Sequence, residues 1–260
     1  PAIYGIDTRK LAKTIREYGS MNGRLTVKKP PYGPEELEQI RNFRITSAVE
    51  SVTPAGCHLI KTTGKADYRV VLWDFGAKEN ILRELTKRGC DVYDATASTT
   101  ADEILALDPD GIMLSNGPGN PEDNARVIEE LKKLAVAKRP IFGICLGHQL
   151  LAIARGAKTG KMKYGHRGAN QPVKDLETGR IYISSQNHGY EVLRESLPAG
   201  AEETFINVND GTCEGITYRD IPAFTVQFHP EACAGPKDTE ELFGRFIKMM
   251  EKYKEEASCR

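Results

Sequence analysis

The sequence lacks the features that mark membrane proteins and nucleic-acid-binding proteins. No apolar run approaches the roughly 18 residues that a membrane span needs, and no signal peptide is visible at its start. Lys plus Arg and Asp plus Glu are equal at 36 each. A chain without net charge has no electrostatic reason to bind nucleic acid or an anionic membrane. We therefore expect neither as a partner.

Paired cysteines are also lacking. The six cysteines stand far apart in the sequence, none forms a CxxC pair, and no Cys/His cluster has zinc spacing. The sequence therefore predicts no metal site. A chain of 260 residues without secretory features is expected to keep its thiols reduced in the cytoplasm. With 40% hydrophobic residues, it can form a core without disulfides.

The first 67 residues differ in pattern from the rest. The chain opens with Pro1 rather than Met, and we expect that an upstream part of the natural protein is absent. A helix is predicted between Asp7, as its N-cap, and Gly19, and a second short helix within residues 30–42. Residues 46–67 are rich in Ser, Thr, Gly and Pro, which predicts a linker with short extended pieces.

Beyond the linker, short apolar strands alternate with amphipathic helices. Strands are predicted at residues 69–74, 91–94, 111–115 and 141–144. Thr100 and Glu103 form a capping box for one of the helices between them. This alternation is typical of βαβ units. For residues 68–255 we expect an α/β fold, with an open, mostly parallel sheet flanked by helices, as in flavodoxin-like proteins.

The pattern becomes richer in strands after residue 160. The triplet Glu177-Thr178-Gly179 indicates a hairpin turn, and further strands are predicted at 204–208, 214–218 and 223–228. The last helix is expected to start at Asp238 as its N-cap, with Glu241 three residues on.

One join between a strand and a helix has the pattern of a nucleophile elbow. It reads Gly143-Ile144-Cys145-Leu146-Gly147, with glycines two residues before and two after the cysteine. Bulky residues at the glycine positions would collide with the neighbouring strand and helix. The helix N-terminus next to the sulfur favours a thiolate. Without the paired glycines, a buried cysteine acting as a small hydrophobe would be the better interpretation.

A base for this nucleophile is indicated by His229-Pro230-Glu231, which follows a predicted strand. The carboxyl ends of parallel strands are where ligands bind in open α/β sheets. A catalytic cysteine needs a base, and the base needs a group that fixes its tautomer. The roles are then Cys145 as nucleophile, His229 as base and acid, and Glu231 as orienter. A hydrogen-bonded loop histidine is the alternative, and His148 is more typical of a packed or hydrogen-bonded residue.

Two further segments are rich in glycine and polar residues. The segment 115–121, Ser-Asn-Gly-Pro-Gly-Asn-Pro, can aim backbone amides at a ligand, although taken alone it is better interpreted as a plain turn. It is not a phosphate loop, because no Lys-Ser/Thr follows. The segment 186–190, Gln-Asn-His-Gly-Tyr, is interpreted as a polar loop after a strand, which can bind a polar substrate or simply form a turn.

Together these motifs resemble the triad-type, class I glutamine amidotransferases. A closer resemblance is to the family of small, glutamine-hydrolysing subunits of carbamoyl-phosphate synthases, and it runs from about residue 3 to 253. It is carried by the segments 5–11, 156–159, 170–173 and 186–190 and by Gly235-Pro236.

The resemblance implies glutamine hydrolysis through a γ-glutamyl thioester on Cys145, with His229 and Glu231 completing the triad. L-glutamine would be held by Gly117, Gly119, Leu146, Gln149, Asn187, Gly189 and Tyr190. The amides of Gly119 and Leu146 would be the oxyanion donors. This chain would carry no cofactor. Its partner, the large subunit, would receive the ammonia through a tunnel and make carbamoyl phosphate from bicarbonate with ATP and Mg²⁺, for pyrimidine or arginine synthesis.

The resemblance also divides the chain. Residues 1–45 would be the tail of a separate N-terminal domain, 46–67 a linker and 68–255 the amidotransferase domain. Three alternatives stay open. A stand-alone γ-glutamyl hydrolase would have the same fold; a non-catalytic regulatory relative would lack Cys145; and the amidotransferase subunit of another synthetase would not share the segments 5–11 and 170–173.

Overall fold

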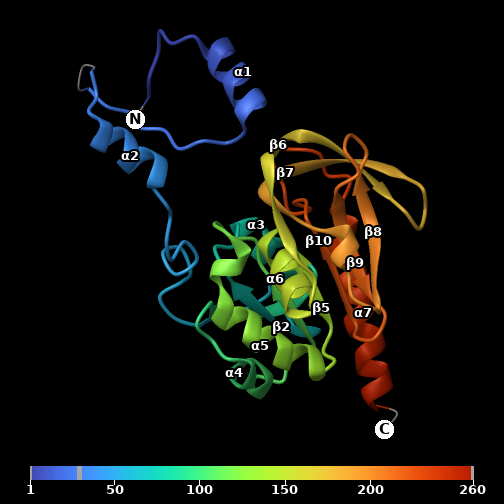
Figure 1. Cartoon of the computed structure of the whole chain (residues 1–260). Helices are drawn as coiled ribbons and strands as arrows, with labels where there is room; N and C mark the ends of the chain where they lie inside the picture. Colours follow the sequence, from blue (N-terminus) through green and yellow to red (C-terminus); the bar gives the residue numbers. More distant parts are fainter. Residues whose placement is uncertain (1, 28–30, 259–260) are drawn as a thin grey trace.

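The computed structural model describes residues 2–27 and 31–258 (Figure 1). Two helices precede the sheet, α1 (Thr8–Tyr18) and α2 (Pro34–Asn42), and neither has a buried residue. The Asp7 carboxylate accepts a hydrogen bond from the amide of Lys10, which confirms the predicted N-cap. Ser20 donates its amide to the carbonyl of Lys163 at 2.8 Å, which ties this N-terminal part to the sheet.

Five parallel strands form the centre of the sheet, in the order β3-β2-β4-β5-β10. Their bounds are β2 Tyr68–Asp74, β3 Cys90–Thr96, β4 Gly111–Leu114, β5 Ile141–Ile144 and β10 Ala223–Val226. In chain order this is the arrangement 2-1-3-4-5 of flavodoxin-like sheets. The carboxyl ends of all five strands therefore meet at one edge of the sheet. The α/β class predicted from the sequence is confirmed.

Helices cover both faces of this central sheet. They are α3 (Glu79–Thr86), α4 (Ala101–Ala106), α5 (Ala125–Val136), α6 (Leu146–Ala154) and α7 (Glu241–Ser258), with two short 3-10 turns, η1 (Pro121–Asp123) and η2 (Arg194–Ser196). Alternate residues of β2 enter different cores: Val71 and Trp73 pack with α4, α5 and α6, whereas Val70 and Leu72 pack with α3 and α7. The period of two along a strand thus explains why the middle of β2 is apolar on both faces.

Helix ends follow the predicted caps in one case and not in another. Thr100 and Glu103 form the predicted capping box of α4. The expectation that Asp238 caps the last helix was wrong, because α7 begins at Glu241 after a turn. The Asp238 carboxylate instead accepts a hydrogen bond from the amide of Ile183, so it joins the segment before α7 to a neighbouring strand.

The other half of the sheet is antiparallel. Strand β9 (Cys213–Tyr218) pairs with β10, and the sheet continues through β7 (Ile181–Val192), β6 (Thr159–Asp175) and β8 (Ala201–Asn207), which returns to pair with β9. Figure 1 shows the long β6–β7 hairpin beside the helical layers. Its turn contains Gly179 with φ +73°, as the turn prediction requires. The predicted loop at 186–190 was wrong, because these residues belong to β7.

The segment predicted as a linker lies against the sheet. Its strand β1 (His58–Ile60) pairs antiparallel with β3 at the sheet edge, and Val49 is buried in the core. The hydroxyl of Thr53 donates to the carbonyl of Asp74 and accepts from the amide of Ala97. The three-part division of the chain stays a prediction.

None of the helices in the described residues combines the length and apolar character that crossing a bilayer demands.

Candidate active site

Cys145 stands at the turn between β5 and α6 in a backbone conformation that side chains rarely adopt. Its φ is +52° and its ψ is −101°. Such strain persists only where the surroundings fix it. Here the Cys145 amide donates to the carbonyl of Val226 at 2.8 Å, and the Gly147 amide donates to the carbonyl of Ser115 at 3.0 Å. Bonds to two neighbouring strands therefore hold the turn on both sides.

The two glycines of the elbow have no room for a side chain. A Cβ on Gly143 would lie 2.8 Å from Cγ2 of Thr225, and one on Gly147 would lie 2.5 Å from the carbonyl oxygen of Leu114. The second contact is to backbone, which cannot turn away. The helix thus sits close against the strands, as the spacing of glycines in the sequence predicts.

The predicted base and orienter lie next to Cys145 because β5 and β10 are neighbours in the sheet. His229 follows β10, and its Nδ1 hydrogen-bonds Oε1 of Glu231 at 2.7 Å. Of the influences that raise the pKa of His229, the charge of Cys145 is the largest, so the two side chains are neighbours. Since Nδ1 is used by Glu231, Nε2 is the nitrogen left for the sulfur. All three residues are buried.

The charges of this group explain its titration. Burial lowers the pKa of His229, but the charge and hydrogen bond of Cys145, followed by those of Glu231, raise it to about 9. Burial raises the pKa of the Glu231 carboxyl, but His229 and Lys78 outweigh it and the net shift is downward. The imidazole is therefore held as a cation at neutral pH.

Two residues that support the triad have no signal in the sequence. The ammonium of Lys78 forms an ion pair with Oε1 of Glu231 at 3.1 Å, and the side-chain amide of Asn80 donates to the backbone carbonyl of Glu231. Both follow β2, whose carboxyl end lies at the same sheet edge. Only the strand order of the sheet could have pointed to them.

The glycine-rich segment after β4 approaches the start of α6. A Cβ on Gly117 would lie 2.7 Å from Cδ2 of Leu146, and Gly119 has φ +93°. The Asn116 side chain binds the loop after β2, accepting from the amide of Lys78 and donating to the carbonyl of Gly76. Among the described residues, the amides of Gly119 and Leu146 have no hydrogen-bond acceptor. They can donate to a ligand.

The remaining predicted residues join α6 to β7. Gln149 is buried, and its Nε2 donates to the carbonyl of Tyr190 and to Oε1 of Gln227, both at 2.9 Å. Asn187 and Gly189 lie on β7 just before Tyr190. Burial, followed by the charge of Asp123, raises the pKa of Tyr190. Backbone and side-chain groups of β7 thus border the helix that carries Cys145.

The other buried histidines lie behind this site. His148 is fully buried, its Nδ1 hydrogen-bonds the Thr225 hydroxyl at 2.8 Å, and burial lowers its pKa to about 3. Burial likewise lowers the pKa of His188 to about 3. His166 differs: burial lowers its pKa, but Glu214 and Asp210 outweigh burial and raise it to about 9.

A comparison with models of protein families identifies the family of the chain. Residues 71–249 match the model described as glutamine amidotransferase class-I. The chain belongs to the class I glutamine amidotransferase family. The match spans the whole region from β2 to α7 that builds the site.

Curated relatives of this class I amidotransferase are carbamoyl phosphate synthase small chains. The chain is 49% identical to that of Symbiobacterium thermophilum, over 97% of this chain and 70% of the relative. It is 51% identical to that of Bacillus cereus strain ATCC 14579, over 98% of this chain and 69% of the relative. These similarities include the N-terminal part, which the family match does not cover.

Solved structures confirm the fold of the class I domain. A GMP synthase subunit from Thermoplasma acidophilum is 23% identical with a TM-score of 0.66, and the match covers 74% of this chain and 98% of that one. A glutamine amidotransferase from Thermotoga maritima is 20% identical with a TM-score of 0.51, covering 74% and 84%.

Proposed function

We propose that this class I amidotransferase is the glutamine-hydrolysing small subunit of a carbamoyl-phosphate synthase. The observation that carries the proposal is the elbow cysteine beside a buried His–Glu pair, Cys145, His229 and Glu231. The names of the relatives, at about half identity over nearly the whole chain, supply the kind of synthetase.

The first half of the reaction forms a thioester. The thiolate of Cys145, whose proton resides on the His229 imidazolium, attacks the side-chain carbonyl carbon of glutamine, and the carbonyl oxygen becomes an oxyanion. The free amides of Gly119 and Leu146 donate to it. The imidazolium of His229 then gives its proton to the departing nitrogen, which leaves as ammonia. The product is a γ-glutamyl thioester.

The second half regenerates the enzyme. Neutral His229 takes a proton from water, the hydroxide adds to the thioester carbonyl, and glutamate leaves as the thiolate is restored. Glu231 keeps Nδ1 protonated throughout, so that Nε2 exchanges the proton. Glutamine itself is held by the glycines of the loop after β4 and by Gln149, Asn187, Gly189 and Tyr190.

The ammonia passes through a tunnel to a large subunit. That partner binds ATP and Mg²⁺ and combines the ammonia with bicarbonate into carbamoyl phosphate, for pyrimidine or arginine synthesis in the cytoplasm. This chain supplies no cofactor to the reaction.

The test joins labelling to assembly. A glutamine analogue with an electrophilic carbon in place of the amide should modify one residue, Cys145, as mapped by peptide mass spectrometry. The Cys145→Ser variant should neither be labelled nor release glutamate from glutamine. Mixed with a carbamoyl-phosphate synthase large subunit, the unaltered chain should enable that subunit to make carbamoyl phosphate with glutamine as the nitrogen source. Labelling of another residue would contradict the proposed mechanism. Hydrolysis of γ-glutamyl peptides, together with a failure to bind the large subunit, would indicate a stand-alone hydrolase.

A further inference from the structure

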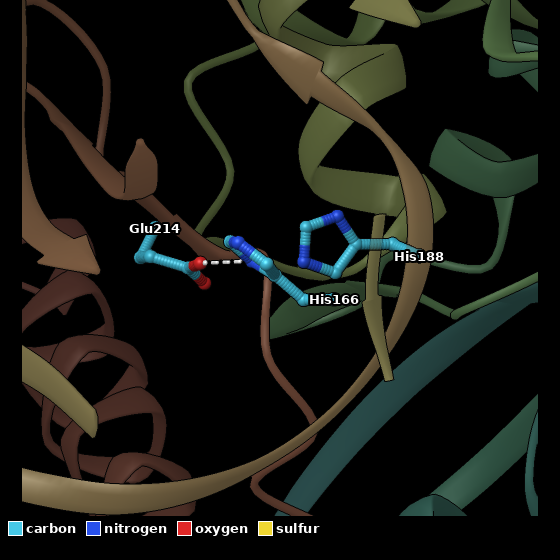
Figure 2. Close-up of side chains that lie close together, drawn as sticks. All are labelled: His166, His188 and Glu214. Atoms are coloured by element: carbon cyan, nitrogen blue, oxygen red, sulfur yellow. Dashed lines mark hydrogen bonds and ion pairs between the residues drawn. The ribbon is translucent and has the colours of Figure 1, made fainter. Parts of the chain in front are cut away.

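Three buried side chains from three antiparallel strands converge behind the candidate active site. His166 on β6 and His188 on β7 are directly paired in the register of the hairpin, and Glu214 lies on β9. Figure 2 shows the two imidazole rings side by side, with the Glu214 carboxylate pointing at His166. One ligand atom of each side chain lies within 4.8 Å of those of the other two.

Each histidine uses one ring nitrogen for a hydrogen bond to a partner outside the cluster, and its other ring nitrogen faces the cluster. The Nε2 of His166 hydrogen-bonds Oδ2 of Asp210 at 2.8 Å, which leaves Nδ1 facing Oε1 of Glu214 at 3.2 Å. The Nδ1 of His188 must donate to the carbonyl of Tyr190 at 2.8 Å, because a carbonyl can only accept. Histidines that bind metals are held in this way, by a carboxylate or a backbone carbonyl on the outer nitrogen.

The inward nitrogen of His188 lacks a donor. Its neighbour is Oε1 of Gln186 at 3.0 Å, which is also an acceptor. The Gln186 amide is fixed in this orientation because its Nε2 donates to the Ser184 hydroxyl, which already donates to the carbonyl of Gln171. In a neutral imidazole two lone pairs therefore face each other.

The carboxylate has an unused oxygen as well. Glu214 is fully buried, and its Oε2 has no hydrogen-bond partner among the described residues. A buried carboxylate oxygen without a partner is costly, and such groups usually bind a proton, a metal or another donor. The cluster therefore presents an unpaired nitrogen and an unpaired oxygen to the same small space.

We propose that His166, His188 and Glu214 form a binding site for Zn²⁺. Two imidazoles and one carboxylate are a common zinc donor set, with zinc–ligand distances of about 2.0–2.2 Å. The 3.2 Å between His166 Nδ1 and Glu214 Oε1 is already the separation of two ligands on one zinc ion. The ion takes the place of the proton between His166 and Glu214, and that proton is released.

The location gives the ion a structural role. His188 lies between Asn187 and Gly189, so zinc fixes the part of β7 that borders α6. The sequence gives no hint of this site, because its ligands stand far apart along the chain and only the pairing of β6, β7 and β9 brings them together. The proposal does not rest on glutamine hydrolysis.

Zinc binding to the full chain tests it. All measurements use a Cys145→Ser background, so that the active-site thiol cannot supply a ligand. After incubation with Zn²⁺ and desalting, metal analysis should find one zinc per chain. The Asp210→Asn variant removes only the negative charge of the outer partner of His166 and should weaken zinc binding about 10- to 100-fold. His188→Gln and Glu214→Gln should weaken it at least as much, whereas His58→Gln, at an exposed histidine on β1, should have no effect.

The Asp210→Asn variant keeps the test decisive if a core variant fails to fold, because that side chain is 43% exposed. Failure of the background chain to retain zinc would overturn the proposal. So would equal affinity in the Asp210→Asn and His58→Gln variants, which would place any bound zinc elsewhere. A tetrahedral Co²⁺ absorption spectrum that disappears in Glu214→Gln would support it independently.

Discussion

The two halves of the sheet hold a buried histidine against a carboxylate in different ways. In the parallel half, His229 and Glu231 leave the end of β10 only two residues apart, at the edge where β5 delivers Cys145. In the antiparallel half, His166 and Glu214 lie within strands and 48 residues apart. The first arrangement places the predicted catalytic groups just beyond the ends of strands, and the second places its groups within strands. The contrast predicts that glutamine hydrolysis depends on the groups at the strand ends, and that the groups within strands contribute to stability.

The largest expected effect is that of His229→Asn. Asparagine preserves polarity but cannot exchange a proton, so glutamine should still bind while thioester formation slows by about 10²- to 10⁴-fold. Single-turnover release of ammonia measures the step. The matched change in the other half, His166→Asn, should leave that chemical step within about tenfold of the original. An equal loss in both would erase the distinction between the halves.

The elbow glycines give the next largest effect. A Cβ on Gly147 would meet the backbone of Leu114, so Gly147→Ala should destabilise the fold by about 1–3 kcal/mol. Denaturant unfolding measures the free energy. The control is Gly244→Ala in α7, where a Cβ meets nothing within 4 Å and the helix should gain about 0.5–1 kcal/mol. Similar destabilisation of both variants would show that close packing at the elbow is not the cause.

The dependence of stability on pH distinguishes the buried histidines whose pKa is raised from those whose pKa is lowered. The pKa values of His229 and His166 are raised to about 9, so their stabilisation is complete below about pH 6.5 and is lost as the pH rises through about 9. The pKa values of His148 and His188 are lowered to about 3, so stability falls as the pH drops from about 6.5. The free energy of unfolding should therefore be highest near pH 6.5.

The alkaline side of that profile can be sharpened with one variant. His166→Gln, measured with a chelator present, should flatten the loss of stability between about pH 6.5 and 9, because it removes one of the two raised groups. An unchanged alkaline slope would mean that His166 is not held as a cation by Glu214 and Asp210.

The smallest effect is expected at Lys78. Its side chain is 46% exposed, so the ion pair with Glu231 is partly screened by solvent. Lys78→Met should lower the rate of glutamine hydrolysis by no more than about fivefold. Lys87→Met, which removes a pair with Glu240 on the surface, should leave the rate unchanged. A loss above a hundredfold would assign Lys78 a direct part in the chemistry.

The sequence predicts the parallel half far better than the antiparallel half. The elbow at Cys145, the capping box at Thr100 and the N-cap at Asp7 could be predicted from the sequence. Each of them depends on residues only a few positions apart. The segment 186–190 was misread as a loop, since two of its polar side chains, Gln186 and His188, are buried by the folding of the strands, which the sequence does not show. The same reason hides the meeting of His166 with Glu214. The contact of Lys78 with Glu231 could have been predicted only if the order of the strands in the sheet had been known.

The register in which β5 pairs with β10 sets the position of Cys145 relative to His229. Ile144 lies opposite Val226, and Cys145 donates its amide to that same Val226. Slipping one strand by a single residue would move its end by about 3.3 Å and turn each side chain to the opposite face. A designer grafting this chemistry onto another scaffold would have to copy two adjacent strands before copying any side chain.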